Sequence, residues 1–138
     1  MMKAGKYYVG DLCYVMQESW DEVCELIIRP GSGRLLEGEF NLKDGRRFAV
    51  YSTKYGDGTY YDGEGGRYFV DAGVIGCILY DDIDPNERND VDGGNVIVFK
   101  EDFNTSSDGG NITIGNVTIL TGDYDEEPEE EEYEYEDA

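Results

Sequence analysis

Short runs of apolar residues, and stretches where apolar and polar residues alternate, cover most of the first 120 positions. Segments 6–16, 37–53 and 67–80 are rich in β-branched and aromatic residues, which favour strands. Residues 74–80 are apolar at nearly every position, and this predicts a central strand that is buried on both faces. Shorter apolar runs at 96–99, 112–114 and 117–120 predict further strands.

Two dipeptides predict tight hairpins between these strands. Asp44-Gly45 separates the alternating positions Phe40 and Leu42 from the partner run at 48–53. Gly115-Asn116 separates the last two runs and suits a two-residue turn with positive backbone φ angles. The antiparallel arrangement of neighbouring strands follows from such short connections.

One segment has the pattern of a helix, over about residues 19–29. Ser19 followed by Glu22 matches a capping box, and Pro30-Gly31 marks the end of the helix. The apolar residues that fall near one face are Trp20, Val23, Cys24, Ile27 and Ile28. We therefore expect a mainly β or α+β fold, an antiparallel sandwich or partly open barrel of about seven to nine strands with this one helix.

The charge of the chain is concentrated at its C-terminal end. Of the 32 acidic residues, eleven lie in segment 123–138, which has no basic residue, so about half of the net charge of −21 lies there. This segment has too few apolar residues to offset the entropy of ordering, and we expect a disordered acidic tail. The remaining residues, 1–122, are expected to form a single globular domain, which fits the total length of 138.

A strongly acidic surface limits the classes of partner. It repels phosphates, so direct binding to nucleic acid is not expected, whereas a basic protein would be attracted. An acidic body with an acidic tail could instead mimic a nucleic acid and inhibit a basic nucleic-acid-binding protein, and this alternative stays open.

Cysteine spacing and hydropathy bear on the compartment. Cys13, Cys24 and Cys77 are odd in number and widely spaced, unlike a secreted disulfide framework. The first residues lack the apolar core of a signal peptide, and no run approaches the ~18 apolar residues of a membrane span. We expect a cytoplasmic protein, in a host cell or packaged in a virion, and no membrane partner. The oligomeric state is left open.

Nucleophilic catalysis has little basis in this sequence. The chain has no histidine, which removes Ser-His-Asp and Cys-His machinery and the commonest zinc ligand. No C-x-x-C pair supports a thiolate metal site. We predict no catalytic residues and favour a protein that is not an enzyme.

Carboxylates in two glycine-rich loops are the remaining chemical candidates. Oxygen ligands of this kind suit calcium, or a carboxylate-dependent carbohydrate-binding or hydrolase site, although neither loop has the EF-hand register. The candidate metal ligands are Asp57, Asp62, Glu64, Asp82, Asp84, Asp90 and Asp92. Asx-turns and solvated loop faces explain the same residues without a ligand, and no other cofactor is expected.

Tyrosines accompany the first of these loops. Tyr55, Tyr60, Tyr61 and Tyr68 lie around Asp57 and Asp62 in the sequence. Exposed tyrosine beside carboxylate suits stacking and hydrogen bonding to a sugar, a peptide or a cationic group. Tyrosine is also a good strand residue, so a core role is the competing interpretation.

Three segments form a recognisable pattern: residues 8–15, which read YVGDLCYV, residues 20–22, and residues 68–76, which read YFVDAGVIG. They resemble the signature of an uncharacterised family of small β-rich proteins from bacteria, phages and large DNA viruses. Leu12 stands where that family more often has proline. The resemblance implies a shared β fold and no known activity. We expect Asp11 and Asp71 to brace turns, or, together with Tyr14, to contribute to one site formed by both motifs.

The function predicted from these patterns is non-catalytic binding. The expected partner is a protein, engaged through the tyrosine- and aspartate-rich loops and the acidic tail. The candidate binding residues are Asp11, Tyr14, Asp57, Tyr60, Tyr61, Asp62 and Asp71.

Overall fold

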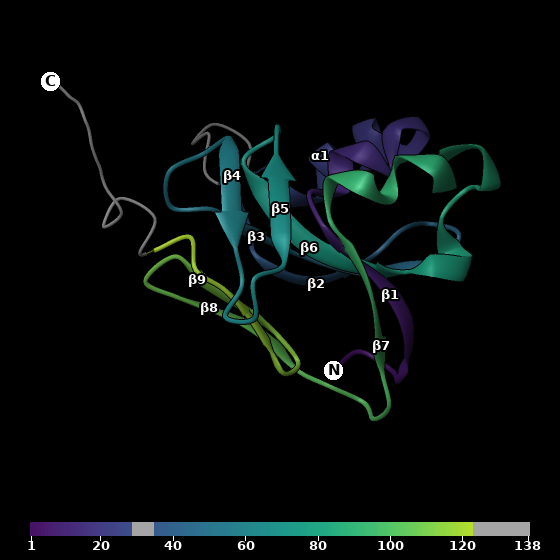
Figure 1. The fold of residues 1–138 in the computed structure, drawn as a ribbon. Coiled ribbons are helices and arrows are strands. Elements are labelled where there is room, and N and C mark those ends of the chain that lie inside the picture. The colour runs from purple at the N-terminus through teal and green to yellow at the C-terminus, as the bar shows by residue number, and fades with distance from the viewer. Residues whose placement is uncertain (29–34, 123–138) are drawn as a thin grey trace, which may run out of the picture.

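The computed structural model describes residues 1–28 and 35–122 of the chain. A five-stranded antiparallel sheet, in the order β2-β3-β6-β1-β7, forms its centre (Figure 1). Its strands are β1 (Gly5–Gly10), β2 (Gly38–Asn41), β3 (Arg47–Ser52), β6 (Val74–Leu79) and β7 (Asn95–Phe99). β6 lies in the middle of this sheet, and five of its six residues, all but Leu79, are buried, as predicted for a central strand.

Two smaller antiparallel sheets cover one face of the large sheet. One is the hairpin of β4 (Gly58–Tyr61) and β5 (Arg67–Val70). The other has the order β10-β9-β8 and consists of β8 (Thr105–Asp108), β9 (Asn111–Ile114) and β10 (Val117–Ile119). The apolar core between these layers includes Tyr7, Tyr60, Tyr68, Ile75 and Ile112.

Helical segments cover the opposite face. They are α1 (Trp20–Ile27) and the 3-10 segments η1 (Leu12–Tyr14), η2 (Gln17–Ser19), η3 (Tyr80–Asp82) and η4 (Pro85–Gly93). A second apolar core lies between these helical segments and the large sheet, and it includes Tyr8 and Phe48. Their sequence neighbours Tyr7 and Ala49 belong to the first core, on the other face of the sheet. Successive strand residues point to opposite faces, so one sheet supports both cores.

The predicted fold class is confirmed, because the described chain is mainly β, with antiparallel sheets and one α-helix, and it is not a closed barrel. It has ten strands rather than seven to nine. β8 was missed because Thr105-Ser106-Ser107-Asp108 is polar and is held by backbone pairing with β9. β4 was missed because it begins within a glycine-rich stretch. The second carboxylate-bearing loop expected from the sequence, from Asp82 to Asp92, is mostly 3-10 helix.

The predicted hairpins are confirmed. In the first, β2 pairs with β3, and the Leu42 N–H donates to the Arg46 carbonyl across the Asp44-Gly45 turn. In the second, Ile114 on β9 faces Val117 on β10 across Gly115-Asn116. Local turn chemistry therefore sets both registers.

The predicted capping box is wrong. Ser19 makes no side-chain cap, and its hydroxyl accepts a hydrogen bond from Arg46 instead. The buried Glu87 carboxylate of η4 accepts from the Gln17 amide at 2.5 Å and from the Glu18 amide at 3.5 Å, and so caps η2, the 3-10 segment directly before α1. A residue distant in sequence thus satisfies the unpaired amides at this helical start. The predicted Pro30-Gly31 stop and the predicted disordered tail at 123–138 lie outside the described residues.

Candidate functional site

The Asp11 side chain is fully buried at the end of β1 and accepts three backbone hydrogen bonds. One carboxylate oxygen accepts from the Cys13 amide at 2.9 Å, which caps η1. The other accepts from the amides of Asp71 and Ala72, at 2.8 and 2.7 Å. Segments 8–15 and 68–76, which are distant in the sequence, therefore meet at one buried carboxylate.

This contact is a brace between β1 and the turn that joins β5 to β6. The Tyr8 hydroxyl donates to the Asp11 carbonyl, and burial raises the pKa of Tyr8. Burial and the Asp11 charge also raise the pKa of the Cys13 thiol to about 12, so the thiol stays protonated near neutral pH. The expected bracing role is confirmed for Asp11. Asp71 takes part through its backbone amide alone, and its side chain is exposed.

Asp62 organises the turn between β4 and β5. One of its carboxylate oxygens accepts from the amides of Glu64 and Gly66, at 2.9 and 2.8 Å, and the other accepts from the Tyr68 hydroxyl at 2.7 Å. Burial opposes ionisation of Asp62, but these three hydrogen bonds together lower its pKa below the usual value. Burial and the Asp62 contact raise the pKa of Tyr68.

Replacing Asp62 with asparagine should lower the free energy of unfolding at pH 7 by about 1 kcal/mol, the typical contribution of a hydrogen bond to a partly exposed carboxylate. Because the folded pKa is depressed, the ionised form contributes stability above the unfolded pKa of about 3.9, and this is lost as the pH falls through the folded pKa. Urea unfolding at pH 7 and pH 3 should show the difference shrinking at the lower pH. Asp57→Asn, at an exposed position in the preceding loop, is the control. An equal loss at both pH values would contradict the ionic explanation.

The tyrosines expected to form a binding surface divide between core and surface. Tyr60 and Tyr68 are buried, and the Tyr60 hydroxyl donates to the Gly56 carbonyl at 2.9 Å. Tyr61 and Tyr55 are 50% and 41% exposed. Tyr14 is half-buried beside the second core. The sequence cluster is therefore not a continuous aromatic face.

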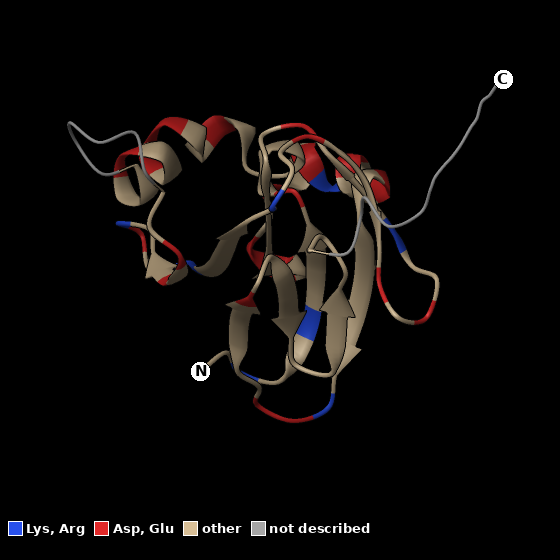
Figure 2. Ribbon diagram, turned by 90° about the vertical axis from the view of Figure 1, so that its left-hand side faces the viewer, with Lys and Arg blue, Asp and Glu red and all other residues tan. Residues whose placement is uncertain are grey.

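The candidate metal ligands are spread over the structure. Asp84 accepts from the Asn86 amide and starts η4, and burial raises the pKa of Asp82. Asp90 and Asp92 are exposed on η4. Within residues 1–28 and 35–122, no group of three or more Cys, Asp or Glu side chains is close enough to hold a metal ion. Figure 2 shows acidic positions mainly in helical segments and connecting loops.

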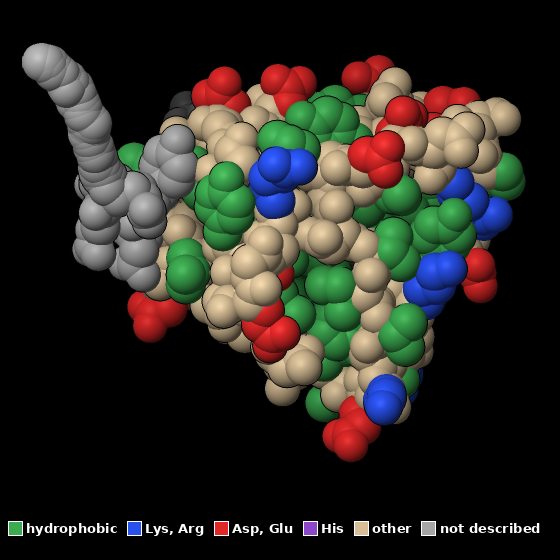
Figure 3. Space-filling view, viewed as in Figure 1, with side chains coloured by type: hydrophobic (Ala, Val, Ile, Leu, Met, Phe, Trp, Pro, Cys, Tyr) green, Lys and Arg blue, Asp and Glu red, His purple; other side chains and the backbone are tan. Residues whose placement is uncertain are grey.

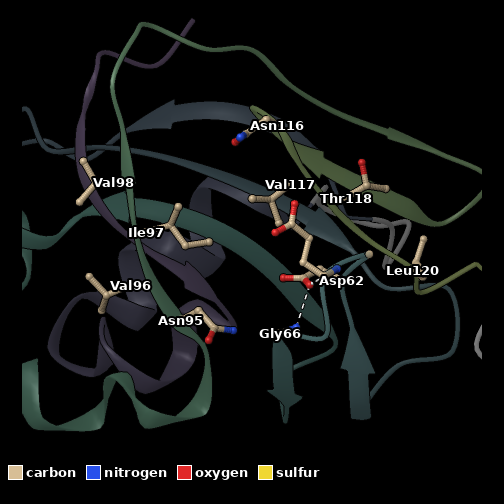
Figure 4. Close-up of a pocket in the computed structure, with 12 residues that line it drawn as sticks. Asp62, Gly66, Asn95, Val96, Ile97, Val98, Asn116, Val117, Thr118 and Leu120 are labelled. Atoms are coloured by element: carbon tan, nitrogen blue, oxygen red, sulfur yellow. Dashed lines mark hydrogen bonds between the residues drawn. The ribbon is translucent and has the colours of Figure 1, made fainter.

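A groove separates strand β7 from the β4–β5 turn and β10. It has a volume of about 590 Å³, and Figure 3 shows it as a hollow with an apolar floor and acidic side chains on one rim. In Figure 4, the labelled side chains of β7 lie on one side, and Asp62 and Val117 lie on the other. The lining residues of the turn and β10 are Asp62, Gly63, Glu64, Gly66, Asn116, Val117, Thr118 and Leu120.

The groove follows the edge of β7 rather than one of its faces. Four consecutive residues, Asn95, Val96, Ile97 and Val98, all line it. Neighbouring side chains of a strand point to opposite faces, so only a cavity along the strand's side can touch four in a row. β7 is the outer strand of the five-stranded sheet, and Val96 and Val98 are 39% and 64% exposed.

A second cavity of about 730 Å³ continues along the same strand. It shares Val98 and Asn116 with the first, and extends past Phe99 to Asn104. We call the two cavities together the β7 groove. Its length covers the whole of β7, which is five residues long.

The β7 groove includes only two of the residues nominated from sequence, Asp62 and Glu64. Asp11, Asp57, Tyr60 and Asp71 do not line it and do not converge on either cavity. The residues that sequence reasoning missed are Asn95, Val96, Val98 and Asn116. The one local signal for these residues is the uncharged apolar run at 96–99. This run predicts a strand but does not show that the strand lies at the edge of a sheet, since that depends on the order of the strands.

Comparisons of the chain with protein families, with curated proteins and with solved structures find no match. Among the described helices, none has the length and apolar character that crossing a membrane requires. The interpretation of function therefore depends on the site itself.

Proposed function

We propose that this chain is a non-catalytic binding protein and that its partner is a protein, which contacts the β7 groove. The observation that supports this most is the pair of exposed valines, Val96 and Val98, on an edge strand that borders a groove. Apolar side chains around a concave surface provide the contact area on which protein interfaces depend.

The tyrosine- and aspartate-rich loop contributes to this surface through the turn 62–66, with Tyr61 exposed beside it. The acidic segment 123–138 would add long-range attraction for a basic partner. This arrangement favours recognition over chemistry, because Asp11 and Asp62 are occupied as acceptors of backbone and hydroxyl hydrogen bonds.

The two alternatives from the sequence have less support. A calcium- or carboxylate-dependent carbohydrate-binding or hydrolase site needs several carboxylates at one place, and the described acidic residues form no such cluster. An acidic nucleic-acid mimic needs regularly spaced charges, whereas the acidic residues that face the β7 groove accompany an apolar floor.

Selection of a displayed library of linear 12-residue peptides on the immobilised full chain tests the proposal. We expect enrichment, and at least a tenfold loss of affinity when both exposed valines are changed in Val96→Thr/Val98→Thr, because two apolar contacts are weakened. Threonine keeps strand propensity, so the fold should be unaffected. Absence of any enriched peptide would overturn the proposal, as would binding that the double variant leaves unchanged.

A further inference from the structure

We infer that the partner segment adds to β7 as an extended strand and carries a lysine or arginine that meets Glu64. This inference rests on the proposed function and specifies the occupant of the β7 groove. Four features of the groove carry it: an open backbone edge, alternating side chains on β7, the lack of protection against pairing, and the charge of the opposite rim.

The first feature is the open backbone. In the described part of the chain, β7 pairs only with β1, from Gly5 opposite Phe99 to Val9 opposite Asn95. In an antiparallel pair, every second residue directs its N–H and C=O away from its partner. These groups of β7 face the groove, since the groove runs along this edge. An extended segment could pair with them over about 17 Å, at ~3.4 Å per residue.

The second feature is the alternation of side chains on β7. Ile97 packs against the first core, while Val96 and Val98, which point to the other face, are exposed. A strand paired with β7 would place its own side chains alternately beside Ile97 and beside the two valines. The groove therefore favours a segment with β-branched or apolar residues at every second position.

The third feature is that β7 lacks the usual protection of an edge strand. Natural edges commonly carry charges, proline or bulges that prevent pairing with other chains. Residues Asn95–Phe99 contain no charged residue and no proline, and they pair with β1 in unbroken register. The opposite edge strand, β2, has four residues and carries Glu39, which forms an ion pair with Arg47. Among the described strands of the large sheet, β7 is therefore the edge better suited to pairing.

The fourth feature is the charge of the opposite rim. Asp62 and Glu64 line the first cavity, and none of its described lining residues is basic. Asp62 is engaged by three hydrogen bonds, whereas the exposed Glu64 side chain has none among the described residues. Glu64 can therefore receive a cation from a segment that lies between the turn and β7.

The charge also gives the occupant a direction along the groove. Glu64 lines the first cavity, which borders Asn95 to Val98, and does not line the second, so the cationic residue of the partner is expected toward the Asn95 end. At that end, the Asn95 side chain donates to the Arg67 carbonyl at 3.0 Å and bridges β7 to β5. A second copy of this chain, with the same net charge of −21, is a poorer occupant than a basic segment.

The peptides enriched in the library selection on the full chain test this inference. We expect an alternating pattern of apolar residues with lysine or arginine at one fixed position. Glu64→Lys should weaken binding of the best such peptide about fivefold. Glu25→Lys, which makes the same charge change at an exposed position on α1, should leave it unchanged.

Amide hydrogen exchange measured by NMR, with the same peptide bound, tests the mode of binding. Strand addition should slow exchange at alternate amides of Asn95–Phe99. Slowed exchange in other segments but not in β7 would overturn this inference, as would equal effects of Glu64→Lys and Glu25→Lys. Neither result would contradict protein binding itself. Self-association through β7 in the absence of peptide would overturn the choice of occupant. A selection that enriches no peptide would overturn the proposed function as well.

Discussion

Replacing Asp11 with alanine should lower the free energy of unfolding by about 4 kcal/mol. The change leaves three backbone amides, those of Cys13, Asp71 and Ala72, without their acceptor in a fully buried place. Each unsatisfied buried donor costs about 1–3 kcal/mol, and relaxation around the vacated space recovers part of the total. Loss of the brace should also loosen the turn between β5 and β6, whose amides it holds. Urea unfolding monitored by circular dichroism measures the effect.

Asp71→Ala is the matched control for this prediction. It removes a carboxylate from the same contact region, but that carboxylate is exposed and the backbone amide remains. Its effect should stay within about 0.5 kcal/mol, as for most surface changes. Asp11→Asn should fall between the two, because one oxygen is retained while the new NH₂ group faces a donor. A loss below 1 kcal/mol for Asp11→Ala would show that the brace is dispensable.

The part of the fold that could be predicted depends on local signals. The Asp44-Gly45 and Gly115-Asn116 turns require particular backbone angles, and both hairpins follow from them. The run at 74–80 is apolar because β6 is covered on both faces. β8 was not predictable in this way, because its polar residues are held in place by β9 and carry little strand preference of their own. Ser19 does not cap α1, since it is the last residue of η2, which leads directly into the helix. The start of η2 is capped instead by Glu87, 70 residues after Gln17.

The candidate site was less accessible to sequence reasoning. Asp11 and Asp62 were identified by residue type and context, but nothing in the sequence shows that both are engaged by hydrogen bonds. Val96 and Val98 looked like ordinary strand residues, because the order of strands in a sheet is fixed by long-range pairing. The pairing of β1 with β6 on one side and with β7 on the other places β7 at the edge, and no local sequence pattern indicates this pairing.

Gly76→Ala is expected to destabilise the protein by about 3 kcal/mol or more, or to prevent cooperative folding. Gly76 lies in β6 and faces Val50 of β3 and Gly10 of β1. A Cβ atom at this position would stand 1.8 Å from the Ala49 carbonyl oxygen and 3.0 Å from the Val50 Cα. These are backbone atoms of the neighbouring strand, so no side-chain rotation relieves the overlap. The two central strands must separate, which disturbs both cores that this sheet supports.

The control for this effect is the same substitution where space is free. A Cβ at Gly63, in the β4–β5 turn, meets no atom within 4 Å, and its backbone does not have a positive φ angle. Gly63→Ala should therefore change stability by less than about 0.5 kcal/mol, or raise it slightly through the unfolded state. Thermal and urea unfolding of both variants measure the difference. Because the two changes add the same methyl group, a Gly76→Ala variant as stable as Gly63→Ala would contradict the close approach of β3 and β6.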